Sequence, residues 1–270
     1  MNPDLAITYC RMIAKTLGLD HAGLEMLVRG TGIDVETLLH SDGFIDWPGI
    51  RQLITNAHQL TDQPDIALQT GLRALPAMHG PMGMAAMASP TLRNAMQLFA
   101  RFNNTRTRIF NTVMEETPEV ITLRMVFAYP QSPTIQFLTE SAMASAYACH
   151  VVLRGKPIDG GSAYFNYPPP LWADRYPQVF PGTRIVFDAP DTAMSLPASY
   201  GDEPLPSHDR DLLWVAIQQC EIRQEALRKQ GTVSDRVLSL MHQKPGKAKL
   251  ERIAGPLPMG PRPLIRFFFF

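Results

Sequence analysis

The stretch Gly80–Phe99, GPMGMAAMASPTLRNAMQLF, contains a strong start signal for a helix. Ser89 can cap that helix, because its hydroxyl can accept a hydrogen bond from a backbone N–H of the first turn, and Pro90 suits the first helical position. The apolar residues recur at helical spacing: Leu92, Ala95, Met96, Phe99 and Phe102. Four arginines on and after the helix are expected to be solvated: Arg93, Arg101, Arg106 and Arg108. The stretch therefore predicts a helix that begins at Ser89 and packs one face into a core.

The sequence before this stretch predicts a series of short helices over residues 3–72. Apolar side chains recur there every three or four positions: Leu5, Tyr9, Met12 and Ile13 are the first of them. Asp34 and Asp46 stand where a carboxylate would cap the start of a helix, and Trp47-Pro48 follows the second. We therefore expect a helical N-terminal part.

The sequence after the stretch predicts a mixture of strands and helices. Ile109–Glu116 and Val120–Phe127 are separated by a Thr-Pro-Glu turn, which indicates a β-hairpin. A long helix, three short strands and another helix are expected next: 134–154, 162–167, 184–187, 193–196 and 207–229. Strands that follow a helix in this way favour an α+β fold over a doubly wound sheet.

The composition is that of an ordinary globular protein. Of the 270 residues, 45% are hydrophobic and 19% are charged, which is typical of a chain with a real core. No apolar run approaches the roughly 18–20 residues that a membrane-spanning helix needs, and the N-terminus lacks the basic start of a signal peptide. The three cysteines are far apart and odd in number, which fits a reducing compartment. We therefore expect a cytoplasmic protein with no membrane partner.

The charge is distributed unevenly along the neutral chain. Residues 221–270 contain ten basic and four acidic side chains, a net charge of +6, which leaves −6 for residues 1–220. An acidic body with a basic end suits nucleic-acid binding, because attraction to phosphates supplies much of the affinity. The alternative is a solvated helix surface followed by a basic tail.

The basic end contains a pattern of its own in Lys247–Phe270, KAKLERIAGPLPMGPRPLIRFFFF. One apolar stripe falls at helical spacing: Leu250, Ile253, Ala254 and Leu257. A break and a second group with arginines follow, which is the plan of a helix-turn-helix. Pro256 and Pro258 stand where the first of the two helices should end and turn. The alternative is a Pro-rich tail without function.

The order of residue types in this segment resembles the first helix-turn-helix of the AraC/XylS family of transcription regulators. The resemblance extends upstream. Gly80–Gly83 followed by the SPT-led helix from Ser89 resembles the arabinose-binding-type regulatory domain of that family, in its OruR-like branch. The segment from Tyr164 to Pro206 looks like the second half of the same domain.

The resemblance implies a ligand-responsive bacterial regulator that works as a homodimer, binds promoter DNA and needs no cofactor. Residues 1–206 would form the effector-binding domain, 207–230 a linker or dimerisation helix, and 231–270 the start of a DNA-binding domain, incomplete because the family's second helix-turn-helix is missing. The expected fold is α+β: a helical N-terminal part, a mixed α/β regulatory domain and an all-α, incomplete helix-turn-helix end.

Two sets of site residues follow from this interpretation. Arg262 and Arg266 match the positions of groove or phosphate contacts, and Lys247, Lys249 and Arg252 those of contacts to the DNA backbone. Methionines adapt to varied ligands, so the segment 75–88 can form the wall of an effector pocket: Met78, His79 and Met82 are the candidates. The alternative for that segment is ordinary loop and core packing.

The sequence contains no catalytic motif of a common enzyme class. HExxH, paired CxxC, P-loop, GxGxxG and GxSxG patterns are all absent. Cys149 and His150 are neighbours on a predicted helix, so their side chains diverge and cannot form a nucleophile–base pair with each other. We therefore predict neither an enzyme nor a metal site. Two alternatives remain open: a small-molecule-binding or dimerisation module without DNA binding, and an enzyme of unrecognised type.

Overall fold

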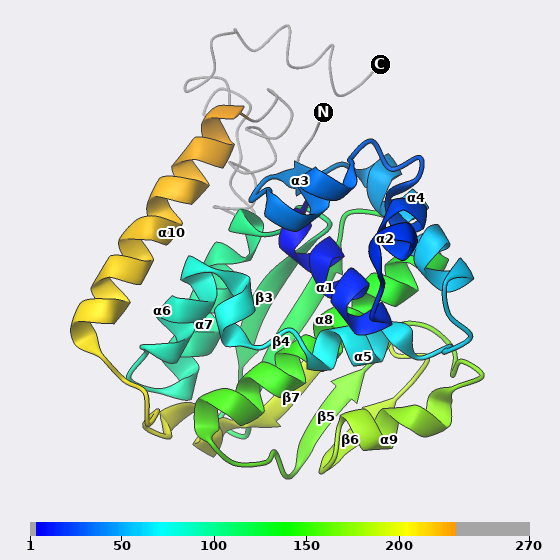
Figure 1. The fold of residues 1–270 in the computed structure, drawn as a ribbon. Helices are drawn as coiled ribbons and strands as arrows, with labels where there is room; N and C mark the ends of the chain where they lie inside the picture. Colours follow the sequence, from blue (N-terminus) through cyan, green and yellow to red (C-terminus); the bar gives the residue numbers. More distant parts are fainter. Residues whose placement is uncertain (1–3, 231–270) are drawn as a thin grey trace, which may run out of the picture. The chain divides into compact units, whose positions relative to one another are not determined.

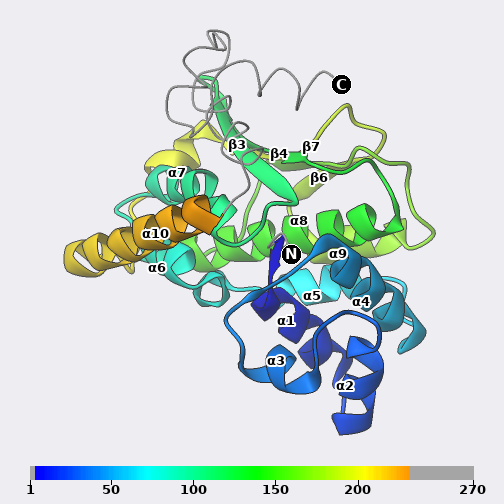
Figure 2. The same cartoon turned by 90° about the horizontal axis from the view of Figure 1, so that it is seen from above.

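The computed structural model describes residues 4–230 of the chain. The chain divides into two units, residues 1–220 and 221–270, and the features below belong to the first. In that unit a group of short helices and a five-stranded sheet lie on opposite sides of one long helix, α8 (Pro133–Arg154), as Figures 1 and 2 show. The predicted α+β class is confirmed.

Short helices form the N-terminal part, as predicted: α1 (Ile7–Leu17), α2 (His21–Val28), α3 (Val35–His40), α4 (Trp47–Gln59) and α5 (Ile66–Leu72). Two short strands pair with each other there: β1 (Leu5–Ala6) and β2 (Phe44–Ile45). Asp34 and Asp46 cap α3 and α4, because each carboxylate accepts a hydrogen bond from a backbone N–H three residues later. The inward faces of these helices pack into one core cluster that contains Leu27, Leu38 and Leu53.

The helix that the sequence predicts to begin at Ser89 begins later, at Leu92. The elements after α5 are η1 (Pro76–His79), α6 (Pro81–Met87), α7 (Leu92–Phe102) and η2 (Asn103–Thr105). The prediction of Ser89 as the cap is wrong, since Thr91 caps α7. The Ser89 hydroxyl instead donates to the carbonyl of Ala85 at 2.8 Å, at the end of α6. The predicted inward face of α7 is confirmed, with Phe99 only partly buried.

The sheet has the strand order β3-β4-β7-β5-β6. Its strands are β3 (Phe110–Glu116), β4 (Val120–Phe127), β5 (Gly161–Tyr164), β6 (Thr183–Val186) and β7 (Thr192–Pro197). The first two form the predicted hairpin, with Phe110 opposite Phe127, and β5 and β6 are the parallel pair. Ser132 caps α8 at its start, and Gly155 ends it in the left-handed conformation (φ +68°), which glycine adopts without strain.

The remaining elements are η3 (Ala173–Arg175), α9 (Tyr176–Val179), η4 (Ala198–Asp202) and α10 (Arg210–Gln230), of which only the part up to Cys220 belongs to the first unit. A second core cluster joins the sheet, α7, α8 and α9, and contains rings in contact with one another: Phe165, Tyr167, Tyr176, Phe180 and Phe187. In the part of the chain from residue 4 to residue 230, no helix is long and apolar enough to cross a membrane.

Candidate functional site

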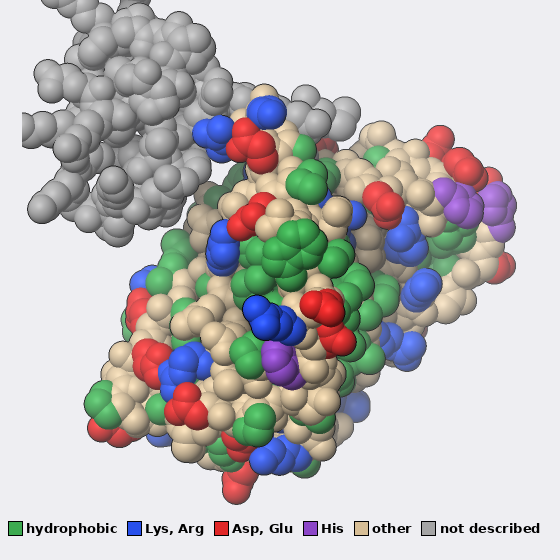
Figure 3. Space-filling view, turned by 90° about the vertical axis from the view of Figure 1, so that its left-hand side faces the viewer, with side chains coloured by type: hydrophobic (Ala, Val, Ile, Leu, Met, Phe, Trp, Pro, Cys, Tyr) green, Lys and Arg blue, Asp and Glu red, His purple; other side chains and the backbone are tan. Residues whose placement is uncertain are grey.

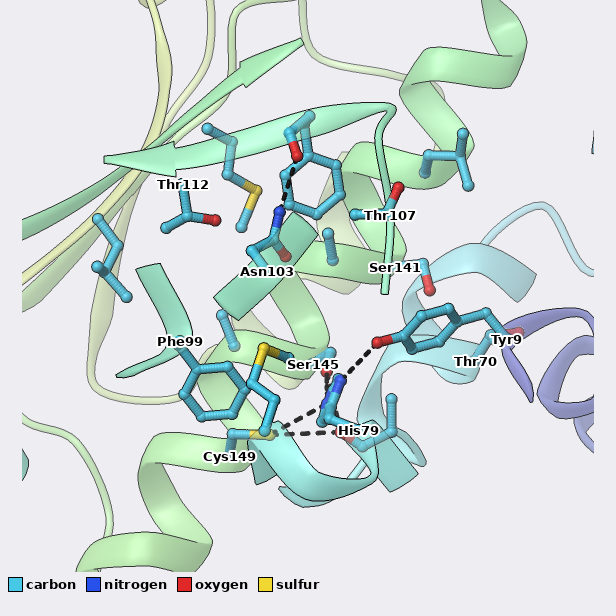
Figure 4. A pocket seen from close by; sticks show the side chains of 18 of the residues that line it. Tyr9, Thr70, His79, Phe99, Asn103, Thr107, Thr112, Ser141, Ser145 and Cys149 are labelled. Atoms are coloured by element: carbon cyan, nitrogen blue, oxygen red, sulfur yellow. Dashed lines mark hydrogen bonds between the residues drawn. The ribbon is translucent and has the colours of Figure 1, made fainter. Parts of the chain in front are cut away.

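A cavity of about 130 Å³ lies at the junction of the two halves of the first unit. It is enclosed by α1 on the helical side, by α7, β3 and β4 on the sheet side, and by α5, α6 and α8 (Figure 4). Its walls are mostly apolar: Met82, Met96, Phe99, Met125, Phe137 and Leu153 are examples. A small, largely apolar cavity with a few polar groups is the usual form of a small-molecule site.

The polar groups of the cavity meet around His79. Nδ1 of His79 is 2.8 Å from the Tyr9 hydroxyl, and Nε2 is 3.1 Å from the Ala74 carbonyl. Ser145 Oγ and Cys149 Sγ lie 3.1 and 3.6 Å from Nε2. A carbonyl oxygen can only accept, so Nε2 bears the hydrogen and Nδ1 accepts the hydrogen of the Tyr9 hydroxyl.

These groups are uncharged at neutral pH. Burial, with a smaller contribution from the charge of Arg106, lowers the pKa of His79 to about 4. Burial likewise raises the pKa of the Cys149 thiol to about 12. A nucleophilic cysteine needs the opposite arrangement, a thiolate beside a protonated base. The cluster is therefore suited to hydrogen bonding with a ligand rather than to attack on one.

The sequence anticipated part of this site. His79 and Met82, two of the three residues expected to form an effector pocket, line the cavity. Met78 is partly buried beside them but is not among the lining residues. Tyr9 and Cys149 were not expected there, because nothing in the local sequence indicates that segments 70 residues from His79 converge on its ring.

Of the arginines expected to be solvated, Arg106 is buried, so that expectation is wrong for it, and Arg93 is partly buried in ion pairs. Arg93 forms ion pairs with Glu116 and with Asp202, the latter at 3.1 Å. Arg106 is only 6% exposed, and its guanidinium carbon lies 5.5 Å from the centre of the Tyr9 ring. Arg93 pairs with Glu116 at the end of β3, and Arg106 lies against Tyr9 near the start of the chain. A helical pattern in the sequence cannot reveal such contacts with distant segments.

The second set of expected site residues cannot be placed. Lys247, Lys249, Arg252, Arg262 and Arg266 lie outside the described residues. Within residues 4–230, no three or more His, Cys, Asp or Glu side chains are grouped so that they could hold a metal ion.

Comparisons with known proteins extend this description. Residues 22–205 match the sequence model of the "Arabinose-binding domain of AraC transcription regulator, N-term". The ornithine utilization regulator of Pseudomonas aeruginosa is 28% identical over 232 residues, which cover 86% of this chain and 68% of that protein. An uncharacterized HTH-type transcriptional regulator of Mycobacterium tuberculosis is 23% identical over 249 residues, 89% of this chain and 71% of that one.

A solved structure supports the fold. The crystal structure of the transcriptional regulator CdpR from Pseudomonas aeruginosa matches with a TM-score of 0.51 at 15% identity, over 82% of this chain and 73% of that one. The named relatives are transcription regulators rather than enzymes. Since the family match covers more than half of the sequence, this chain belongs to the AraC transcription regulators and carries their N-terminal arabinose-binding domain.

Proposed function

We propose that this chain is the sensor of a ligand-responsive transcription regulator and that a small organic effector binds in the cavity beside His79. The observation that carries the proposal is the position of the cavity. Its lining takes residues from both large core clusters, Ile13 and Phe137 from the helical one and Met96 and Leu123 from the sheet one. A molecule bound there contacts both halves at once and favours the arrangement in which both contacts are made.

A third, small core cluster connects the cavity to α10 and supports a proposed path by which effector binding acts on that helix. Met82 lines the cavity and also packs with Phe102 and with Cys220 of α10, where Ile217 adds a further contact. A shift of Met82 on effector binding therefore acts on α10, which leads toward residues 231–270. This route is a spatial connection, and coupling along it is part of the proposal.

The face of α10 supports the proposed homodimer. Its first three turns expose Leu212, Trp214 and Val215, with Trp214 65% exposed. Figure 3 shows hydrophobic side chains gathered on the face of the molecule that carries this helix. An exposed tryptophan on a helix is a typical anchor of a protein interface, so we propose that a second copy of the chain covers it. Trp214→Ala should then shift the chain toward monomers in analytical ultracentrifugation.

DNA binding is proposed for the basic residues of the segment 231–270, Lys247, Lys249, Arg252, Arg262 and Arg266. A regulator of this kind acts on promoter DNA in the bacterial cytoplasm. The test is fluorescence anisotropy on the promoter region beside the gene for this chain and on a scrambled duplex, from about 50 to 200 mM salt. The same chain extended through a complete two-unit DNA-binding domain is the comparison.

Preference of the extended chain for the promoter, with an affinity that falls steeply as salt rises, is the expected result. If neither chain prefers the promoter to the scrambled duplex, the regulator proposal fails. A small-molecule-binding or dimerisation module without DNA binding then becomes the better account.

A further inference from the structure

Arg106 occupies a fixed and almost fully buried position between η2 and β3. Its backbone N–H donates to the Asn103 carbonyl at 2.9 Å, and its own carbonyl accepts from the N–H of Ala6 at 2.9 Å. The side chain is 6% exposed. Both ends of the residue's backbone are thus held, one by η2 and the other by β1.

The guanidinium of Arg106 has no carboxylate partner. Among the described residues no Asp or Glu forms an ion pair with it, and its buried Nε has no hydrogen-bond partner at all. An arginine keeps its charge at every physiological pH, so it cannot avoid the penalty of burial by losing a proton. A buried charge without a partner is strongly unfavourable, and the Tyr9 ring offsets only part of that through a cation–π contact.

The position of this charge relates it to the cavity. Arg106 itself is not among the residues that line the cavity, but Thr107, the next residue, and Tyr9, whose ring it contacts, both are. Tyr9 donates its hydroxyl hydrogen to His79. The hydroxyl oxygen of Tyr9 interacts with Arg106. Burial raises the pKa of Tyr9, and the charge of Arg106 opposes that rise. The same charge adds to the lowering of the His79 pKa that burial causes. The polar end of the cavity therefore lies in a positive potential, although its own groups are neutral.

We infer that the cavity takes a small amphipathic organic monoanion, with an apolar body of about the size of a benzene ring and one carboxylate that lies at the Tyr9 hydroxyl, in the field of the Arg106 charge behind the Tyr9 ring. The inference rests on the proposed function and specifies its effector. The volume limits the apolar body to one small ring, because an apolar cavity of about 150 Å³ holds benzene and this one measures about 130 Å³. The negative charge follows from the guanidinium, since an anion near a buried cation without a carboxylate partner offsets part of the cost of its burial.

The same walls disfavour the molecules that the relatives' names suggest. Among the described residues no Asp or Glu lines the cavity, so the ammonium groups of an amino acid such as ornithine would be buried without a partner. A sugar such as arabinose has hydroxyl groups on every side, and most of the cavity wall is apolar and cannot bond to them. The charge and the polarity of the cavity thus separate the three candidate classes.

The test compares probes of one shape and different charge by isothermal titration calorimetry on the full chain. Benzoate, benzamide and benzylamine share the ring, and L-ornithine and L-arabinose represent the other classes. Benzoate should bind at least about tenfold more tightly than benzamide, since a charge-assisted hydrogen bond adds that much. Benzylamine, ornithine and arabinose should not bind measurably.

Two variants locate the effect. Arg106→Gln should remove the preference for benzoate and leave benzamide binding unchanged, whereas Arg51→Gln on the exposed face of α4 should change neither. The melting temperature without ligand provides a second measurement. If Arg106 is needed for folding, Arg106→Gln should lower the melting temperature. If its buried charge serves a ligand instead, the variant should have an unchanged or higher melting temperature.

Equal binding of benzoate and benzamide, full benzoate binding by Arg106→Gln, or no binding of any ring probe would each overturn the inference. None of these results decides the proposed function, which fails only if promoter DNA is not preferred. Loss of the melting transition in Arg106→Gln would also contradict the inference, because it would assign Arg106 a structural role.

Discussion

Arg154 and Arg106 are both buried, yet their surroundings differ completely. Arg154, at the end of α8, donates to both carboxylate oxygens of Glu203 at 2.8 and 3.1 Å and to the carbonyl of Pro157 at 2.8 Å. Its guanidinium carbon also lies 3.7 Å from the centre of the Tyr200 ring. Among the described residues, Arg106 contacts the ring and the hydroxyl of Tyr9 but no carboxylate. The first site is complete within the chain, and the second is complete only with an anion from outside.

Glu140 is a buried acid that also has no oppositely charged partner among its hydrogen-bond partners. It is 1% exposed and is held by neutral groups, the Gln136 amide at 3.0 Å and the Tyr176 hydroxyl at 2.8 Å. Burial raises its pKa to about 7, so the carboxyl can take up a proton and become neutral. Arginine cannot become neutral in this way, because its guanidinium keeps its proton at every physiological pH. The difference between acid and base explains why an unpaired Arg106 indicates a ligand and an unpaired Glu140 does not.

The largest effect is expected at the complete site. Glu203→Gln leaves Arg154 buried without its charge partner and also removes the partner of Lys156 at 3.1 Å. The free energy of unfolding should fall by about 3 kcal/mol, which lowers the melting temperature by about 6–12 °C in a unit of this size. Glu115→Gln removes an exposed ion pair with Arg124 and should cost less than about 1 kcal/mol. Equal losses in the two variants, measured by urea unfolding, would mean that the buried Arg154 depends on its carboxylate no more than the exposed Arg124 does.

The next effect is a pH dependence due to Glu140. Its pKa is higher in the folded than in the unfolded chain, so its contribution to stability is fully present below pH 4.5 and is lost as pH rises through about 7. The loss amounts to roughly 3 kcal/mol by pH 8. The difference in unfolding free energy between wild type and Glu140→Gln should follow this course, because the variant keeps an acceptor for Tyr176. A difference that does not change between pH 4.5 and 8 would show that Glu140 stays ionised.

A smaller effect is expected from filling the cavity. Ala142 of α8 lines it, and Ala142→Leu should fill part of the space, raise the free energy of unfolding by about 1 kcal/mol and abolish benzoate binding. Ala22→Leu, on the exposed surface of α2, is the matched control and should do neither. A variant that is destabilised by overpacking would show instead that the space beside Ala142 is not free.

The smallest effect concerns His79. In Arg106→Gln the pKa of His79 should rise, because a like charge is removed, and should stay below the ordinary 6.5, because burial is the main cause of its lowering. A buried neutral histidine loses its stabilising contribution as pH falls from 6.5 toward 4, so the variant should lose less stability in that range. NMR titration of the imidazole signals measures the change directly. An unchanged pKa would mean that the charge of Arg106 does not reach the cavity.

The sequence predicts those features of this fold that depend on near neighbours. Asp34, Asp46 and the long helix that ends at Gly155 follow from caps and periodicity, and the structure has all three. Ser89 was misassigned because the end of α6 competes for its hydroxyl, and that competition depends on a helix whose end the sequence does not mark. His79 was found through its unusual Met-rich segment.

Arg106 shows the limit of such reasoning. A basic residue after an amphipathic helix normally faces water, but the side chain of this one lies against the ring of Tyr9, 97 positions earlier. Long-range contacts of this kind leave no periodic pattern, and the cavity depends on several of them. Its members become visible only when the folded chain brings Tyr9, His79 and Cys149 together.

The close packing of α6 on η1 requires a glycine at position 83, which predicts the effect of mutations at that codon. A Cβ at this position would overlap the carbonyl of Pro76 and press on the Cβ of His79, so any other residue displaces the segment that holds the imidazole. Substitutions at codon 83 should therefore appear in a screen for alleles that no longer respond to the proposed effector, even though residue 83 is not among those that line the cavity.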